Sequence, residues 1–175
     1  MAGFSLNGIH SSEFDIVVRK LTRSIKPAKR VNQQQIPGRH GTYDVTDDSF
    51  DNLLITAECT IGGRDLDTTI HAIAAWLNRG GQLEIDTDPG RFYRAKVWSD
   101  IQTDRFGYVC EFTVIFDCYP LAQSAPHQID VVLTESGQSV EVTTTGNFET
   151  PCVINIINTG TKPITNIILE YRKEL

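Results

Sequence analysis

Residues 37–63, PGRHGTYDVTDDSFDNLLITAECTIGG, decide how this chain folds. A glycine-rich loop and a cluster of aspartates come first, and in the run Leu53–Ile61 that follows, apolar and polar residues alternate. Such alternation is typical of a strand with one face in the core and the other in water. The pair Gly62-Gly63 ends the strand. The stretch therefore predicts a scaffold strand that carries a charged, protruding loop, and it contains no catalytic pattern.

A helix is predicted directly after the glycine pair, over about 65–79. Its apolar residues recur at helical spacing and form one stripe, consisting of Leu66, Ile70, Ile73, Ala74 and Leu77. Aspartates at its start and Arg79 at its end suit the helix dipole. Gly80 is suited to end it, since glycine accepts the left-handed backbone common there.

Strands are predicted on both sides of this segment, with turns at Asn7-Gly8 and at Asp88-Pro89-Gly90. The predicted strands are Gly3–Leu6, the stretch after Ile9, Asp15–Leu21, Gln82–Asp86, Phe92–Ile101 and Phe106–Cys118. The last places alternate apolar residues, from Phe106 to Cys118, on one face. We expect that face to be core, because exposing each large side chain costs about 2 kcal/mol. Residues 22–39 are polar and basic and predict a long loop or arm.

The predicted fold class is α+β, mainly β: an antiparallel, β-sandwich-like N-terminal domain over 1–120 with one packed α-helix. Residues 121–128, with prolines and small residues, predict a linker. Residues 129–175 predict short strands, at 129–133, 139–145, 150–158 and 164–171. They form an incomplete all-β unit, since the chain reaches Leu175 before a sandwich would close.

The composition limits the classes of protein to which the chain can belong. The chain has 175 residues, 40% of them hydrophobic, which is enough for a packed core. No apolar run is long enough to span a membrane, and the N-terminus lacks a signal-peptide pattern, so we expect folding in a cytoplasm. None of the cysteines (Cys59, Cys110, Cys118 and Cys152) is spaced as CxxC, and their neighbours are apolar, so they are predicted to be reduced.

Charge is unevenly distributed. The net charge is −6, yet residues 1–41 hold seven Lys/Arg against two Asp/Glu, and residues 44–67 hold seven Asp/Glu against one Arg. Two interpretations are open: two solvated surfaces, or complementary faces that meet between copies of the protein. The candidate interface residues are Arg19, Lys20, Arg23, Lys26, Lys29, Arg30, Arg39, Asp44, Asp47, Asp48 and Asp51.

No pattern predicts an enzyme or a cofactor. The four histidines are scattered, without an HExxH or HxH pair. The aspartates of 44–51 suggest either a calcium loop or a solvated acidic loop, and the second is favoured because the glycine and final glutamate of a calcium loop are missing. Basic and aromatic residues alternate around Arg94 and Lys96, but the net charge argues against nucleic acid.

An ordered set of segments resembles a known family. These are FSLNGIHSSEFDIVV, then PGRHGTYDVTDDSFDNLLITAECTI, the helix, DPGRFYRAKV, and the aromatic strand that closes in FDCYPL. The order resembles the N-terminal domain of the distal tail protein (Dit) of long-tailed phages and prophages, over about the first 120 residues. GNFETPCVINIINTG is similar to the first strands of that family's C-terminal, galectin-like sandwich.

The resemblance implies a structural protein of the virion tail tip, assembled in the host cytoplasm. It implies a homo-hexameric ring that joins the major tail tube protein to a tail-associated hub or fibre protein, with DNA passing through the centre without specific binding and no membrane partner. In such a ring the basic residues would meet the acidic loop of a neighbour, or the acidic residues would line the channel. The alternative function is a carbohydrate-binding β-sandwich module that contacts the host surface, suggested by exposed aromatics such as Trp98.

Overall fold

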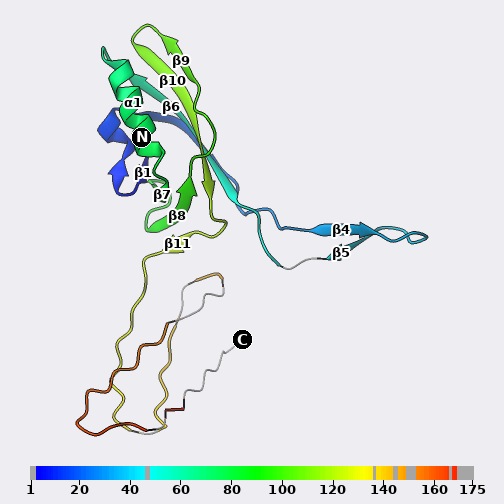
Figure 1. The fold of residues 1–175 in the computed structure, drawn as a ribbon, viewed down its shortest axis with the longest axis vertical. Coiled ribbons are helices and arrows are strands. Elements are labelled where there is room, and N and C mark those ends of the chain that lie inside the picture. Colours follow the sequence, from blue (N-terminus) through cyan, green and yellow to red (C-terminus); the bar gives the residue numbers. More distant parts are fainter. Residues whose placement is uncertain are drawn as a thin grey trace. The chain divides into compact units, whose positions relative to one another are not determined.

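The structure is a computed structural model that describes residues 3–45, 48–135, 137–143, 146–148, 153–165 and 167–168. The chain divides into two units, Met1–His127 and Gln128–Leu175. The first unit holds all the helices and strands named here (Figure 1). They are β1 (Phe4–Leu6), β2 (Ile9–His10), the 3-10 helix η1 (Ser11–Phe14), β3 (Val17–Arg23), β4 (Asn32–Gln35), β5 (Thr42–Val45), β6 (Leu53–Gly62), α1 (Leu66–Leu77), β7 (Gly81–Ile85), β8 (Arg91–Lys96), β9 (Thr103–Phe106), β10 (Val109–Cys118) and β11 (Gln123–Ser124).

The main sheet is antiparallel, with strand order β2-β1-β7-β8-β10-β6-β3, while β11 pairs with β8 and β9 pairs with β10. The long pair β10–β6 joins Val109 with Gly62 at one end and Cys118 with Leu53 at the other. The fold class is therefore the predicted one, mainly β with one α-helix among the described residues. The alternation predicted for Leu53–Ile61 is also confirmed, because every second side chain of β6 is buried.

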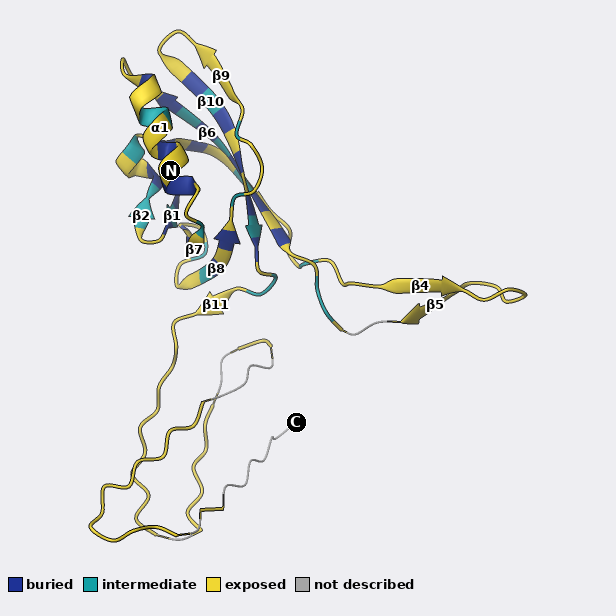
Figure 2. Cartoon of the chain, in the orientation of Figure 1, coloured by how far each residue is buried: buried dark blue, intermediate teal, exposed yellow. Residues whose placement is uncertain are grey.

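The core lies between α1 and the sheet (Figure 2). Phe4 stacks on Trp76 with ring centroids 5.7 Å apart and meets Phe116 edge-on at 5.0 Å. The indole Nε1 of Trp76 donates to the Leu6 carbonyl at 3.2 Å, so the helix is fastened to β1 by a hydrogen bond as well as by packing. Asp65 takes the N-cap position of α1 and Asn78 the C-cap, close to the predicted ends.

The Asn7-Gly8 turn is confirmed, and the side chain of Asn7 holds the start of β7. Asn7 donates from Nδ2 to the Gly80 carbonyl at 2.6 Å and accepts from the Gln82 amide at 3.0 Å. A Cβ at Gly81, whose φ is +136°, would lie 1.9 Å from Asn7 Oδ1, so only glycine fits there. The Asp88-Pro89-Gly90 turn also joins two strands as predicted, β7 and β8, although β8 ends at Lys96 rather than at Ile101.

The prediction of one strand over Phe106–Cys118 is wrong in its first part. Gly107 has a φ of +66° and forms a turn between β9 and β10, so Phe106 and Tyr108 lie at the hairpin tip, each 70% exposed. The physical reason is that ten residues of β10 already match β6 along its whole length. The chain therefore folds back over Thr103–Phe106 instead of extending a single strand.

Residues 28–45 and 48–51 form a protruding element that we call the arm. Its strands β4 and β5 make a two-stranded sheet of their own, separate from the main sheet. The sequence predicted a loop or arm here but not the strands, because glutamines fill β4 and give no apolar alternation. The glycine-rich loop turns the chain between them: Gly38 and Gly41 have φ values of +80° and +86°, and the Arg39 amide donates to the Ile36 carbonyl.

The second unit contains no helix or strand within its described residues, and these residues are exposed. The strand predicted at 129–133, and the described parts of those predicted at 139–145, 150–158 and 164–171, therefore form no hydrogen-bonded ladder there, and the rest of these three predictions lies outside the described residues. A turn does form near Gly160, whose amide donates to Asn158 Oδ1. The predicted domain boundaries and the predicted partial sandwich remain predictions.

Candidate functional site

The base of the arm is closed by backbone hydrogen bonds. Lys29 and Phe50 form an isolated antiparallel bridge. The Arg30 amide donates to the Ser49 carbonyl at 2.9 Å, and the Asp51 amide donates to the Ala28 carbonyl at 2.8 Å. The two ends of the arm are thus held side by side at its root.

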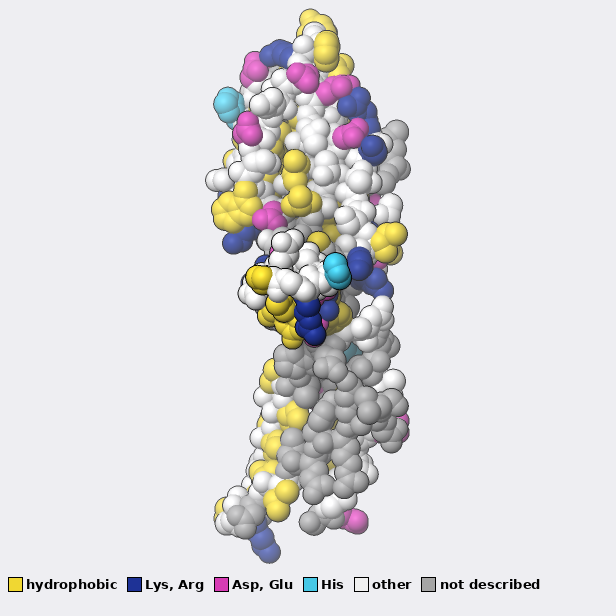
Figure 3. All heavy atoms as spheres, turned by 90° about the vertical axis from the view of Figure 1, so that its right-hand side faces the viewer, with side chains coloured by type: hydrophobic (Ala, Val, Ile, Leu, Met, Phe, Trp, Pro, Cys, Tyr) yellow, Lys and Arg dark blue, Asp and Glu magenta, His cyan; other side chains and the backbone are white. Residues whose placement is uncertain are grey.

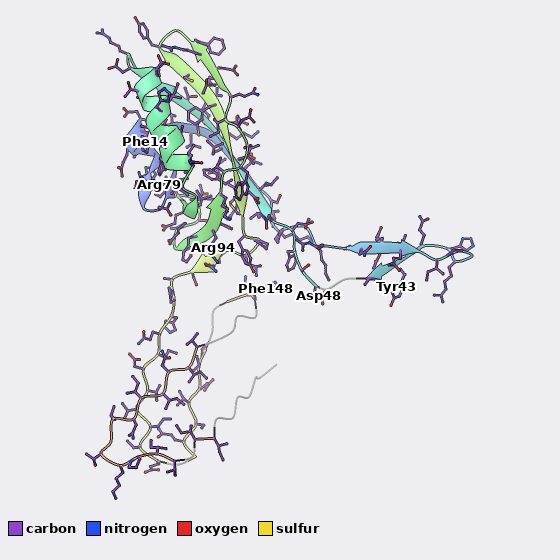
Figure 4. The ribbon with its side chains drawn as sticks, viewed as in Figure 1. Phe14, Tyr43, Asp48, Arg79, Arg94 and Phe148 are labelled. Atoms are coloured by element: carbon purple, nitrogen blue, oxygen red, sulfur yellow. The ribbon has the colours of Figure 1, made fainter. Side chains whose placement is uncertain are left out.

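Two of the basic residues proposed for an interface pair with acidic residues of the same arm. Lys29 forms a salt bridge with Asp48, and Arg30 donates from Nε to Asp51 at 3.1 Å. Figure 4 labels Asp48 at the base of the arm and Tyr43 farther along it. The structure therefore brings the basic and acidic segments together within one chain, at the root of the hairpin.

Three further basic residues, all on β3, also have partners in their own chain. Arg19 donates to Glu111 on β10 at 2.7 Å. Lys20 lies 3.6 Å from Glu58 on β6, with both side chains exposed. These exposed pairs contribute little to stability, but they reduce the unpaired charge that β3 offers to a neighbour.

Arg23, at the end of β3, takes part in a more enclosed network. Its Nη1 donates to Asp88 Oδ2 at 2.5 Å and to the Tyr93 hydroxyl at 2.7 Å. The hydrogen bond to Asp88 raises the pKa of the Arg23 guanidinium. Burial raises the pKa of the Tyr93 hydroxyl, although the nearby Arg23 charge opposes that rise. This network ties the strand that leads into the arm to the β7–β8 turn.

The remaining candidates lie on the arm or at its start. Asp44 accepts a hydrogen bond from Gln33 at 3.0 Å. Lys26 and Arg39 are exposed and form no salt bridge within the described residues. Asp47 lies outside the described residues. The structure leaves the predicted contact between copies untested, and it shows that most of the predicted charges pair within the chain.

One face of the arm carries apolar side chains between polar ones, a feature that the sequence pattern did not predict. Cross-strand pairing places Asn32 opposite Val45 and Gln34 opposite Tyr43, so these four side chains share a face. Val45 is 47% exposed and Tyr43 60%. In Figure 3, where the arm points toward the viewer, hydrophobic, basic and histidine side chains gather at its end. The signal available in the sequence was the alternation Tyr43-Asp44-Val45, which is too short to identify a strand.

Other candidate sites gain no support. No group of three or more His, Cys, Asp or Glu side chains that could hold a metal occurs among the residues that the structure describes. His40 is exposed in the turn of the arm. Trp98 is 71% exposed, with the Lys96 ammonium 5.0 Å from its ring centroid. No helix in the described part of the chain is long and apolar enough to cross a membrane.

The sequence from residue 9 to residue 118 matches the family described as the phage tail protein RIFT-related domain. This match covers more than half of the chain, from β2 to the end of β10. The chain belongs to this family. The resemblance to phage tail proteins is thereby confirmed, and the match includes the arm, α1 and the main strands of the sheet.

The fold is also similar to that of a solved structure, the Dit protein of phage SPP1. That protein is described as a paradigm of the hub adsorption apparatus in phages that infect Gram-positive bacteria. The two structures agree with a TM-score of 0.62 at 16% sequence identity. The similarity covers 71% of this chain and 52% of the SPP1 chain, so this chain matches about half of that protein. A comparison with curated proteins found no match.

Proposed function

We propose that this protein is a structural component of a phage tail tip, in which six copies form a ring between the tail tube and a hub or fibre protein. Membership of the phage tail protein family and the Dit-like fold support this proposal. The role is structural rather than enzymatic. The ring would sit in the virion tail after assembly in the host cytoplasm, and DNA would pass through its centre without specific binding.

The observation that carries the proposal is the arm. An isolated two-stranded hairpin is only marginally stable in water, yet β4 and β5 extend from the domain with both faces exposed. Such an element gains stability when a partner covers it. A contact between the arm of one copy and a different part of the surface of the next copy would be head-to-tail, which is the kind of contact that closes into a ring.

The pairs Lys29–Asp48 and Arg30–Asp51 hold the root of the arm within one chain. Arg39, in the arm's turn, remains the basic residue best placed to meet a neighbour. The candidate residues would therefore divide into two groups, one that stiffens the arm and one that touches the next copy.

Native mass spectrometry and negative-stain electron microscopy of the purified chain test the proposal. The expected result is a six-fold ring, and a ring that binds purified tail tube protein on one side would extend the support to the proposed partner. A chain that stays monomeric at high concentration, both alone and with the tail tube and hub proteins, would contradict the proposed function.

A further inference from the structure

We propose that the end of the arm docks in a groove between α1 and β9 of a second copy of this chain. The proposal rests on the ring proposed above and names the surface that receives the arm. It departs from the contact predicted from the sequence, because two of the four acidic residues of that contact, Asp48 and Asp51, have partners in their own chain.

One face of the arm carries exposed apolar side chains, which no other described residue of the first unit covers. Tyr43 and Val45 lie on this face, and by strand alternation so does Ile36, two residues beyond Gln34. Ile36 is 43% exposed, and all residues from Ala28 to Val45 are exposed. Water therefore contacts three apolar side chains on an element that is only marginally stable by itself, which favours their burial against another surface.

The groove is an apolar recess on the body of the domain. It has a volume of about 70 Å³ and is lined by Ile70, Ile73, Ala74, Ile101, Thr103 and Phe112. The lining comes from one side of α1, from the segment before β9, from β9 itself and from β10. Its size suits one aliphatic or small side chain, so Ile36 is the residue that we place in it.

Charge complements the apolar contact. Asp100 precedes Ile101 in the sequence, and Asp104 follows Thr103, so two carboxylates flank the residues of the groove. Neither forms a salt bridge within the described residues, and both are exposed. Arg39, three residues from Ile36 in the arm's turn, also lacks a salt-bridge partner there. An arm seated by Ile36 would bring Arg39 to these carboxylates, where opposite charges favour one orientation.

The occupant is a second copy because the length of the arm suits that distance. From Lys29 at its root to Ile36 the arm has seven residue steps, about 24 Å at 3.4 Å per residue. A domain of this size is about 35 Å across. The arm is thus long enough to pass a subunit boundary and reach the near side of a neighbour. Every copy has both an arm and a groove, so the contact can repeat around a ring.

Charge exchange is the first test, with oligomer formation measured by light scattering and native mass spectrometry. The variant Arg39→Glu and the double variant Asp100→Arg/Asp104→Arg should each weaken assembly at least tenfold. The combination of all three should restore most of it. Arg94→Glu and Glu13→Arg, which change exposed charges outside the groove, serve as matched controls and should assemble as the unaltered chain does.

Cross-linking is the second test. In a Cys152→Ser background, the pair Ile36→Cys and Ile101→Cys should give covalent multimers up to six chains on oxidation, separated on a non-reducing gel. The native cysteines 59, 110 and 118 are buried and reduced, so they add little background. The pair Ile36→Cys and Ile115→Cys, whose second cysteine replaces an exposed residue on the outer face of β10, should give none.

The outcomes separate the two proposals. A ring that forms but neither cross-links through residues 36 and 101 nor recovers on charge exchange would overturn the docking site and leave the proposed function intact. Cross-linking of the control pair with equal yield would also overturn the site. If the unaltered chain forms no ring with or without its tail partners, both proposals fail.

Discussion

Arg23 and Asp88 are 65 residues apart in the sequence, yet the guanidinium of the first donates a hydrogen bond to the carboxylate of the second. The Asp88 side chain is only 16% exposed, and the Tyr93 hydroxyl accepts from the same Arg23 nitrogen. Arg23 ends the strand that leads into the arm, and Asp88 sits in the β7–β8 turn. This contact therefore couples the position of the arm to the body of the sheet.

Arg23→Ala is expected to lower the free energy of unfolding by about 2 kcal/mol, because it removes the hydrogen-bonded donor of a mostly buried carboxylate whose other basic neighbour, Arg91, lies 3.9 Å away. Urea denaturation measures the loss. Lys20→Ala is the matched control: its pair with Glu58 is exposed on both sides, so we expect a change of about 0.5 kcal/mol or less. Equal losses in the two variants would show that the Asp88 network has no special role.

Trp76→Ala is expected to cost about 3–5 kcal/mol, since it removes a buried ring that packs on Phe4 and Phe14. Trp76→Phe should lower the free energy of unfolding by a smaller amount than Trp76→Ala does. It should still be destabilising, because the Leu6 carbonyl loses its indole donor. Thermal unfolding of both variants checks the order. Trp98→Ala, at a site 71% exposed, should change stability by about 0.5 kcal/mol or less. A larger effect at Trp98 than at Trp76 would contradict the packing described here.

The sequence predicted those parts of the fold in which the spacing of apolar residues matches the positions that are buried. Leu53–Ile61 alternates because β6 lies between β3 and β10 with one face in the core. The helix follows from its stripe of Leu66, Ile73 and Leu77, all buried. Trp76 is also buried, although it lies beside the predicted stripe, because a ring of its size reaches over Phe4 from the flank of the helix.

The remaining features depend on contacts between segments distant in the sequence, which the pattern of residues within one segment does not predict. Phe106 and Tyr108 continue the alternation of β10 in the sequence, but Gly107 turns the chain and leaves both side chains in water. The charged residues at the root of the arm could be recognised as complementary. Whether they pair within one chain or between copies depends on the return of the hairpin, which places Asp48 beside Lys29. The groove combines α1, β9 and β10, so no single segment predicts it.

Stability is expected to fall as the pH rises above about 9. Burial raises the pKa of the Cys59 and Cys118 thiols to about 12, from 9.0 for a free thiol. Between these values the unfolded chain loses thiol protons that the folded chain keeps, so ionisation favours unfolding. At pH 10 each thiol should lower the free energy of unfolding by about 1.4 kcal/mol relative to pH 8.

Urea titrations at pH 8 and pH 10 check this expectation, with Cys59→Ala and Cys118→Ala as the informative variants. Each variant should be less stable than the unaltered chain at pH 8 but should lose less on going to pH 10. The native thiols should also react slowly with alkylating reagents at pH 8, since they are buried. A pH dependence that is the same in all three proteins would assign it to other groups.

Reversal of charge at Asp47 and Asp48 to lysine is expected to weaken assembly, and about 0.5 M salt should act in the same direction by screening exposed charges. The reason lies in the root of the arm, where Asp48 pairs with Lys29 of its own chain. Light scattering measures the oligomer.

Exchanging the two charges, with Lys29→Asp and Asp48→Lys in one chain, should restore assembly because the attraction between residues 29 and 48 is kept. In an equal mixture of the two single variants, by contrast, residues 29 and 48 of each chain carry charges of the same sign. If the pair forms within one chain, this mixture should assemble poorly. Full assembly of that mixture would show that the pair forms between copies, and an unchanged oligomer after the reversal would show that the root of the arm does not control assembly.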